Sequence, residues 1–484
     1  MDSSPLPAPG GAPPLTLPPE QLRAFGYRVV DMLVEHTAGL AAQPVPHAHR
    51  GARPALEARL REPIPEDGTD PEAVLDRLRR DVFSHISHVD HPRFFAFIPS
   101  PGNPVGALAD ALASGFNVFA GTWIESSGPA VVELVVVDWL RQLCGMPEGA
   151  GGLCLSGGSM ANLTALAAAR HARLGTDFGE AVLYCSDQTH SSVARGLRIL
   201  GFRPDQLARL PADAAYRLDV EALREAVRED RVAGRVPFCV VASAGTTNTG
   251  AVDPLGALAD LCEEEHLWLH VDGAYGAAGV LCDEGRAALA GLGRADSIAL
   301  DPHKWLFQPY ELGCVLVRDR RLLREAFHVL PEYLHDAQGT DEEVNFGDYG
   351  VQLTRRFRAL KLWMTIQIYG MAAFRAAVER GFALARHAEA LLHAMTDWEV
   401  TTPAQMGIVT FRHAPPGLIG EALDAHNRAL LDRLHADGFA MLSTTVLDGR
   451  MVIRLCPINP RTTEDDIAAT LAKLDAFARA PGTA

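Results

Sequence analysis

The stretch that decides the fold runs from residue 266 to residue 319, HLWLHVDGAYGAAGVLCDEGRAALAGLGRADSIALDPHKWLFQPYELGCVLVRD. Its first apolar run, residues 267–271, is short and is followed by Asp272 and a glycine-rich break, which predicts a buried strand ending in a carboxylate. A second apolar run, residues 297–300, is closed by a proline that stops regular structure and leaves Lys304 just beyond the strand tip. If the two strands are parallel, their tips are neighbours.

Lysine is scarce in this chain, because besides Lys304 the sequence holds only Lys361 and Lys473. A lysine kept in an apolar turn beside a histidine therefore serves through its amine more than through its charge. A neutral amine condenses with a carbonyl group, which a guanidinium does not do. A nearby carboxylate is what pyridoxal 5'-phosphate (PLP) needs at its pyridine nitrogen, because the protonated ring accepts the electrons released at a substrate's α-carbon. We therefore predict that Asp272 and Lys304 form a PLP site.

The blocks HVDGAYG (270–276) and DPHKW (301–305) resemble the group II PLP-dependent amino-acid decarboxylases, the aromatic L-amino-acid decarboxylase family. The resemblance extends from about residue 17 to residue 477, and several motifs occur in the same order. It implies an α/β enzyme of fold type I, with a mainly parallel sheet covered by helices on both faces, an N-terminal arm and a small α/β C-terminal domain. The joint presence of both motifs disfavours the plain alternative of a solvated loop lysine and a strand-end cap.

Composition excludes several classes of function. At 484 residues the chain exceeds one average domain. Its formal net charge of −16 and the lack of a basic tract argue against a nucleic-acid partner. The eight cysteines are scattered without CxxC pairs or histidine clusters, which predicts no metal site and a reducing cytoplasm. No apolar run reaches the length of a membrane span, so we expect no membrane partner.

The order of patterns predicts four segments. The proline-rich start is expected to be a disordered leader, and an amphipathic helix followed by repeated prolines suits an arm that packs on a partner. In the family such an arm wraps around a second subunit, so the resemblance implies a homodimer with shared active sites. The expected segments are a leader (1–19), an arm for dimerisation (20–103), a large PLP-binding domain (104–373) and a small C-terminal α/β domain (374–484).

The stretch LCLSGGSMANLTALAAARHARL (153–174) predicts a phosphate site, because an apolar strand runs through two glycines into a helix whose N–H groups favour an anion. In the motif SDQTHSSV (186–193), the resemblance implies a histidine that lies flat on the pyridine ring and touches the substrate carboxylate. The predicted cofactor-binding set is Gly158, Ser159, His190, Thr246, Asp272, Asp301, His303 and Lys304.

Three further segments resemble the family's substrate pocket. HPRFFAFIPSPGNP (91–104) is an extended, proline-interrupted connection, and FNVFAGTWIE (116–125) matches a segment contributed by the neighbouring subunit. Either stretch could instead be an ordinary buried turn or dimer core. Thr354 falls where plant relatives vary between glycine and serine, and its hydroxyl mildly favours phenyl or phenol rings over indole. The predicted substrate-binding set is Phe97, Ile98, Pro99, Ser100, Phe119 and Thr354.

HVLPEYLHDAQGTDEEVNFGDYG (328–350) is acidic and without clear periodicity, which is typical of a disordered insert or a functional lid. In the family this stretch is a mobile loop over the active site. Tyr333 then falls on the tyrosine that protonates the α-carbon after CO₂ leaves. The predicted catalytic set is His190, Asp272, Lys304 and Tyr333.

The resemblance implies PLP-dependent decarboxylation of an L-amino acid, with phenylalanine, tyrosine, DOPA or tryptophan favoured, to the amine and CO₂. An aromatic aldehyde synthase on the same scaffold is one alternative, which Tyr333 and His190 disfavour. A decarboxylase of aliphatic or acidic amino acids is another, although the pocket segments hold no arginine apart from Arg93 at the edge of one. An inactive scaffold would have no chemical use for the complete catalytic set.

Overall fold

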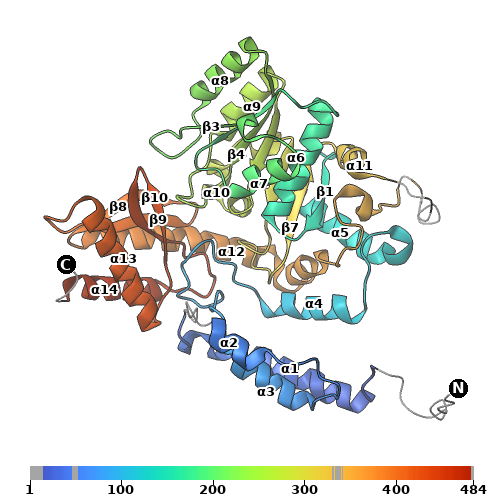
Figure 1. Cartoon of the computed structure of the whole chain (residues 1–484), viewed down its shortest axis with the longest axis vertical. Coiled ribbons are helices and arrows are strands. Elements are labelled where there is room, and N and C mark those ends of the chain that lie inside the picture. Colours follow the sequence, from blue (N-terminus) through green and yellow to red (C-terminus); the bar gives the residue numbers. More distant parts are fainter. Residues whose placement is uncertain (1–14, 46–52, 330–331, 333–339, 341, 481–484) are drawn as a thin grey trace. The chain divides into compact units, whose positions relative to one another are not determined.

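The computed structural model describes residues 15–45, 53–329, 332, 340 and 342–480 (Figure 1). Most of the predicted leader, residues 1–14, lies outside the described residues, and so does Tyr333. The chain divides into two compact units, Met1–His88 and Val89–Ala484.

The first unit is helical, and its helices are α1 (Pro19–Gly39), α2 (Arg53–Leu60) and α3 (Pro71–Asp81). α3 begins with a proline at its first turn, and the Asp70 carboxylate caps it by accepting a hydrogen bond from the N–H of Ala73 at 3.1 Å. α1, which is described in full, contains no buried residue. On its apolar face, Phe25, Val29 and Met32 are half-buried.

A seven-stranded sheet forms the centre of the second unit. Its strands are β1 (Gly151–Leu155), β2 (Ala181–Ser186), β3 (Leu207–Leu210), β4 (Val236–Ser243), β5 (Trp268–Asp272), β6 (Ser297–Leu300) and β7 (Gly313–Val317). They lie in the order β1-β7-β6-β5-β4-β2-β3. The run from β6 to β3 is parallel, whereas β7 pairs antiparallel with both β6 and β1. The predicted mainly parallel sheet is confirmed.

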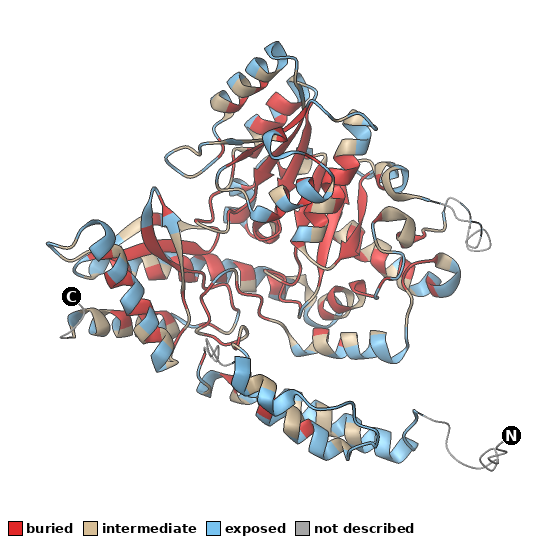
Figure 2. Ribbon diagram, in the orientation of Figure 1, coloured by how far each residue is buried: buried red, intermediate tan, exposed pale blue. Residues whose placement is uncertain are grey.

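Helices cover both faces of this sheet (Figure 1). Those packed on its strands are α5 (Trp123–Leu143), α6 (Gly158–Leu174), α8 (Val220–Val232) and α9 (Leu255–Glu264). The other helices of this part are α7 (Ser191–Ile199) and α11 (Arg321–Phe327), which pack on α6; α4 (Pro104–Gly115), which packs on the helix Ala359–Ala394; and α10 (Asp283–Ala288). Along β4, Cys239 and Val241 pack with residues of α6 and α7, whereas Val240 and Ala242 pack with residues of α8 and α9. Both faces are apolar because both are buried (Figure 2).

The long helix α12 (Ala359–Ala394) leads into a second, smaller layer. This layer is a four-stranded antiparallel sheet in the order β10-β11-β9-β8, with its own apolar core. Its elements are β8 (Trp398–Gln405), β9 (Ile408–His413), α13 (Gly420–Asp437), β10 (Ser443–Leu447), β11 (Arg450–Leu455) and α14 (Glu464–Arg479). The helical path of α12 is interrupted at Gly370, close to the domain boundary predicted at residue 374, and that boundary remains a prediction. In the described part of the chain, no helix is both long and apolar enough to span a membrane.

Candidate active site

A cavity of about 520 Å³ lies at the C-terminal edge of the large sheet. Asp272 is the last residue of β5, and it pairs with Ala299 of the parallel neighbour β6, whose end leads directly to Lys304. The two strand tips are therefore neighbours, as predicted from their apolar runs. All members of the predicted cofactor-binding set line this cavity, namely Gly158, Ser159, His190, Thr246, Asp272, Asp301, His303 and Lys304.

One end of the cavity is formed by the turn between β1 and α6. Gly157 has a φ of +152°, which favours glycine, and a Cβ on Gly158 would lie 2.8 Å from the Cβ of Ala274. No side chain caps the start of α6, so the positive end of a 17-residue helix faces the cavity. This arrangement suits an anionic group such as a phosphate.

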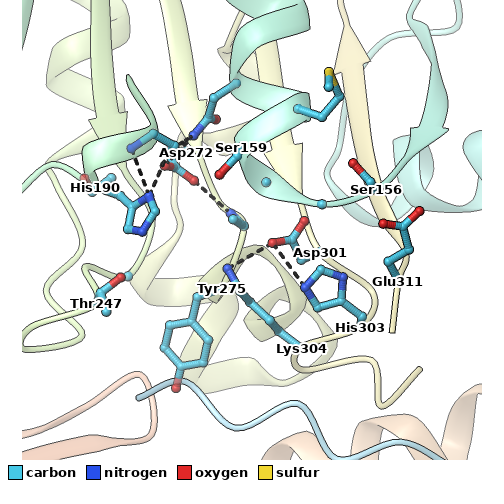
Figure 3. Close-up of a pocket in the computed structure, with 18 of the residues that line it drawn as sticks. Ser156, Ser159, His190, Thr247, Asp272, Tyr275, Asp301, His303, Lys304 and Glu311 are labelled. Carbon is cyan, nitrogen blue, oxygen red and sulfur yellow. Dashed lines mark hydrogen bonds and ion pairs between the residues drawn. The ribbon is translucent and has the colours of Figure 1, made fainter. Parts of the chain in front are cut away.

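Lys304 and Asp301 form an ion pair in this cavity, with 2.9 Å between Nζ and Oδ2 (Figure 3). Burial works to lower the pKa of Lys304, but the charge and the hydrogen bond of Asp301 outweigh burial, so this pKa is raised. The other oxygen of Asp301, Oδ1, is buried and has no hydrogen-bond partner among the residues that the structure describes. Nδ1 of His303 accepts a hydrogen bond from the N–H of Leu312 at 3.2 Å. Burial lowers the pKa of the His303 ring.

Asp272 is anchored through both of its carboxylate oxygens. Oδ2 accepts a hydrogen bond from Nδ2 of Asn162 at 2.8 Å, and Oδ1 accepts one from the N–H of Ala274 at 3.2 Å. Its side chain therefore presents fixed acceptor atoms to the cavity. A cationic N–H group, such as a protonated pyridine nitrogen, is the partner that such a carboxylate suits.

His190 is held at the start of α7. Its Nδ1 accepts the N–H of Ser192 at 3.2 Å and lies 2.8 Å from the hydroxyl of the same residue. Figure 3 shows His190 and Asp272 on one side of the cavity, Asp301 and His303 on the other, and Lys304 between them.

An aromatic stack supports the loop that carries Lys304. Trp305 is fully buried and stacks on Tyr275 with ring centroids 5.0 Å apart and an interplanar angle of 9°. Phe382 of α12 stacks on Trp305 with centroids 5.1 Å apart. The hydroxyl of Tyr275 donates to the carbonyl of Met406, which ties the stack to the small domain. This packing fixes the backbone next to Lys304.

The predicted substrate-binding residues lie elsewhere in the single chain. Among the described residues, none of Phe97, Ile98, Pro99, Ser100, Phe119 and Thr354 lines the cavity. Phe97 is 59% exposed and has a φ of +55°, Thr354 is exposed, and Phe119 is half-buried. Ser100 is buried at 3% exposure. Their roles remain predictions.

Arg355, which follows Thr354, forms a buried ion pair with Glu133 of α5. Arg355 and Glu133 are each 1% exposed and form a salt bridge. The Arg355 guanidinium also donates to the carbonyls of Ala120 (2.9 Å) and Cys154 (2.8 Å), and the N–H of Ala120 donates to the carbonyl of Arg355 (3.0 Å). The backbones next to Phe119 and Thr354 are therefore clamped together.

Several lining residues were not identified from the sequence. They are Ser156, Met160, Asn162, Ser192, Thr247, Tyr275, Tyr310 and Glu311, among others. Asn162 was the most recognisable of them, because it is a lone amide within an otherwise apolar stretch of α6 and is only 1% exposed. A buried amide in such a helix requires polar partners.

The observed groups fit PLP. The cavity offers an amine at Lys304 for covalent attachment, a carboxylate at Asp272 for the ring nitrogen and the start of α6 for the phosphate. The tight approach at Gly158 and the unpartnered Oδ1 of Asp301 mark the α6 end as a place for a polar group.

Comparison with known proteins agrees with this chemistry. The family model described as "Pyridoxal-dependent decarboxylase conserved domain" matches residues 54–414. An aromatic-L-amino-acid decarboxylase from Bacillus atrophaeus is 50% identical over 466 residues, covering 96% of this chain and 97% of that protein.

Solved structures agree as well. A crystal structure of Oryza sativa TDC with PLP and tryptamine superposes with a TM-score of 0.90 at 32% identity, covering 97% of this chain and 99% of that one. Rhodiola rosea 4-hydroxyphenylacetaldehyde synthase superposes with a TM-score of 0.88 at 29% identity, covering 96% and 99%.

The fold and the site define a PLP-dependent carboxy-lyase of fold type I. The chain belongs to the pyridoxal-dependent decarboxylase family.

Proposed function

We propose that this enzyme decarboxylates an aromatic L-amino acid, namely phenylalanine, tyrosine, DOPA or tryptophan, to the amine and CO₂. The similarity to the Bacillus atrophaeus aromatic-L-amino-acid decarboxylase, which extends over nearly the whole of both chains, supports this substrate class. The observation that carries the proposal is that Lys304 and Asp272 line one cavity from neighbouring strand tips.

Each cofactor-binding residue has a proposed task. Lys304 would hold PLP through its amine, the Asp272 carboxylate would serve its ring nitrogen, and Gly158 and Ser159 would bind its phosphate at the start of α6. Bound PLP supplies an electron sink for the pair of electrons left on the α-carbon when CO₂ departs. Thr246, Asp301 and His303 complete the binding set.

His190 and Tyr333 have proposed tasks on the substrate side. The imidazole of His190 would support the cofactor ring and bind the substrate carboxylate, and it would thereby orient the bond that breaks. The hydroxyl of Tyr333 donates a proton to the α-carbon after CO₂ has left. This assignment rests on the sequence position of Tyr333 alone, since the residue lies outside the described part of the chain.

We also propose that the enzyme is a homodimer whose active sites are shared. Apolar side chains form a stripe along α4, where Leu108, Leu112 and Phe116 are 42%, 46% and 80% exposed. Their spacing of four residues places them on one helix face, and Figure 2 shows α4 largely in the colour of exposed residues. An exposed apolar stripe of this kind is typical of a protein–protein surface. A second subunit would bring its own Phe119 toward the cavity.

A cytoplasmic location is proposed as well. The eight cysteines are all free and buried. Free thiols in this number suit a reducing compartment.

The test is product analysis by mass spectrometry. The PLP-loaded protein is given all standard amino acids plus L-DOPA, with Lys304→Ala as the blank and Lys473→Ala as a matched control, because Lys473 is a partly exposed lysine paired with Asp437. We expect amines from aromatic substrates in the wild type and in Lys473→Ala, and none in Lys304→Ala. Amines from aliphatic or acidic substrates alone would contradict the proposed substrate class.

Aldehyde formation is measured in the same mixture. The fold is shared with a protein named 4-hydroxyphenylacetaldehyde synthase, and a phenylacetaldehyde synthase of Arabidopsis thaliana is 32% identical over 459 residues. Aldehyde with hydrogen peroxide in place of amine would assign the enzyme to that activity and would remove the proposed role of Tyr333.

A further inference from the structure

A chain of buried hydrogen bonds runs behind the cavity from Trp268 of β5 to Asp272 and His190. Each intermediate member is at most 3% exposed. The chain first joins Trp268 Nε1 to Ser297 Oγ (2.8 Å), Ser297 Oγ to His270 Nδ1 (2.9 Å) and His270 Nε2 to Asn162 Oδ1 (2.9 Å). At Asn162 it divides. Nδ2 of Asn162 lies 2.8 Å from Asp272 Oδ2 and 2.8 Å from Ser192 Oγ, and Ser192 Oγ lies 2.8 Å from His190 Nδ1.

The direction of every link is fixed by the two ends of the chain. A carboxylate oxygen only accepts, so the Asn162 amide must turn its NH₂ group toward Asp272. Its carbonyl Oδ1 then faces His270, whose Nε2 must carry the hydrogen. From the other end, the indole of Trp268 only donates, so the hydroxyl of Ser297 accepts from it and passes its own hydrogen to Nδ1 of His270.

The charge of His270 agrees with this direction. Burial lowers the pKa of His270 to about 4, against a smaller opposing effect of the Asp272 charge. At neutral pH the ring is therefore uncharged and has one N–H, which the chain places on Nε2. A neutral histidine donates to Asn162 without adding a positive charge behind Asp272.

The amide of Asn162 serves two functional side chains at once. One N–H goes to Asp272 and the other to the hydroxyl of Ser192. That hydroxyl then donates to Nδ1 of His190, which also accepts the Ser192 N–H. The hydrogen of the His190 ring is consequently on Nε2, the nitrogen that Ser192 does not contact.

We propose that Asn162 is a positioning residue that sets the orientation of Asp272 and the tautomer of His190 together, and that His270 fixes the orientation of the Asn162 amide. The inference deepens the proposed function, because it rests on the PLP-binding roles of Asp272 and His190. It assigns to Asn162 and His270 roles that act through Asp272 and His190.

The first test is Asn162→Asp, which keeps the shape of the side chain and replaces its donors by oxygen. The affinity for PLP is measured by titrating the full-length apoprotein and following absorbance, without any amino acid present. Loss of a hydrogen bond to a charged group predicts a rise in Kd of about ten- to a hundredfold. The visible circular dichroism of bound PLP should fall as the ring loses its fixed orientation. A Kd within about twofold of the wild-type value overturns the inference.

The second test separates donation by His270 from its packing. His270→Gln keeps an N–H close to the position of Nε2, whereas His270→Met has similar length and no donor. We expect the Gln variant to bind PLP within about threefold of the wild type and the Met variant to approach the Kd of Asn162→Asp. Equal affinities in the two variants, whether weakened or not, overturn the role of His270.

Asn427→Leu is the matched control for loss of stability. Asn427 is as buried as Asn162 and donates to the carbonyls of His413 and Leu423, both at 2.9 Å, far along the chain in the small domain. We expect its melting temperature to fall and its Kd for PLP to stay unchanged. A Kd that rises as much as in Asn162→Asp would show that stability alone explains the effect and would overturn the inference.

The positioning role of Asn162 and the proposed substrate class can fail independently of each other. If the wild type forms no aromatic amine while the PLP titrations behave as expected, the substrate proposal fails and the positioning role stands. If amine forms while Asn162→Asp binds PLP normally, the positioning role alone fails.

Discussion

Lys304 and Asp301 lie side by side at the end of β6, with Nζ of the lysine 2.9 Å from Oδ2 of the carboxylate. The carboxylate also stands close to the start of α6, since a Cβ on Gly158 would lie 2.9 Å from its Oδ2. Asp301 therefore contacts the lysine proposed to attach the cofactor and lies beside the region proposed for the phosphate. Its negative charge acts on both ends of the binding site.

Removal of this charge should make Lys304 a better nucleophile at neutral pH. Asp301 raises the pKa of Lys304, so Asp301→Asn lowers it and increases the fraction of neutral amine at a given pH. We expect the pH profile for the rate of PLP attachment, followed by stopped-flow absorbance on the apoprotein, to shift toward lower pH. An unchanged profile, or a shift toward higher pH, would contradict this assignment.

PLP should be fixed at a single lysine. The chain has three lysines, and of these Lys361 is 1% exposed and paired with Asp110 at 3.0 Å, whereas Lys473 is paired with Asp437. Borohydride reduction followed by peptide mass spectrometry should place the pyridoxyl group on Lys304 only. Lys304→Arg keeps the positive charge beside Asp301 and should abolish the label. Label on Lys361 would refute the site.

Asp272→Asn should leave PLP attached and slow the chemistry. The substitution removes the charge that is proposed to hold a proton on the ring nitrogen, and loss of one such electrostatic contact costs about a hundred- to a thousandfold in kcat. Steady-state amine formation measures this, and borohydride labelling of Lys304 checks that the cofactor is still attached. A kcat close to that of the wild type would exclude Asp272 as the partner of the ring.

Breaking the buried pair of Glu133 and Arg355 should destabilise the enzyme strongly. Both side chains are 1% exposed, so Glu133→Gln leaves a buried guanidinium without its counter-charge, at a cost of about 3–5 kcal/mol in the free energy of unfolding. Denaturant unfolding measures the loss. Arg321→Ala breaks the exposed pair with Asp319 and is the control, for which we expect no measurable change.

A charge on the apolar stripe of α4 should disrupt the proposed dimer. Leu112 lies in the middle of the stripe, between Leu108 and Phe116, so Leu112→Asp should shift the sedimentation coefficient from dimer to monomer. Val232→Asp, on a residue that is 81% exposed at the end of α8, should leave the assembly unchanged. A wild-type protein that sediments as a monomer would contradict the proposal.

The positions of central strands of the large sheet could be predicted from apolar runs in the sequence. The run at 297–300 coincides with β6, and the run at 267–271 matches β5 to within one residue, because short buried strands between glycine, proline and charged residues have clear ends. The sequence did not reveal that β7 is antiparallel. Only residues 301–312 separate it from β6, and with no crossover helix in that stretch the chain turns back on itself.

The position in the cavity of the residues predicted to bind the cofactor could be read from the sequence, because each follows a strand tip or starts a helix, where motifs are local. Asn162 and His270 were not, because their partners lie 110 and 27 residues away along the chain, at Asp272 and Ser297. Such links exist only once β5 pairs with β6 and α6 packs across the sheet. The substrate-side residues and Tyr333 remain predictions, the former outside the cavity and the latter outside the described residues.

The clamp made by Arg355 has a consequence for directed evolution of this enzyme. The Arg355 guanidinium donates to the Ala120 carbonyl and the Ala120 N–H donates to the Arg355 carbonyl, so the chain on either side cannot be lengthened or re-routed without exposing a buried ion pair. Libraries with loop insertions near Phe119 or Thr354 should yield mostly unfolded protein. Point substitutions at these two positions keep the clamp, and they are the economical way to search for new substrate preferences.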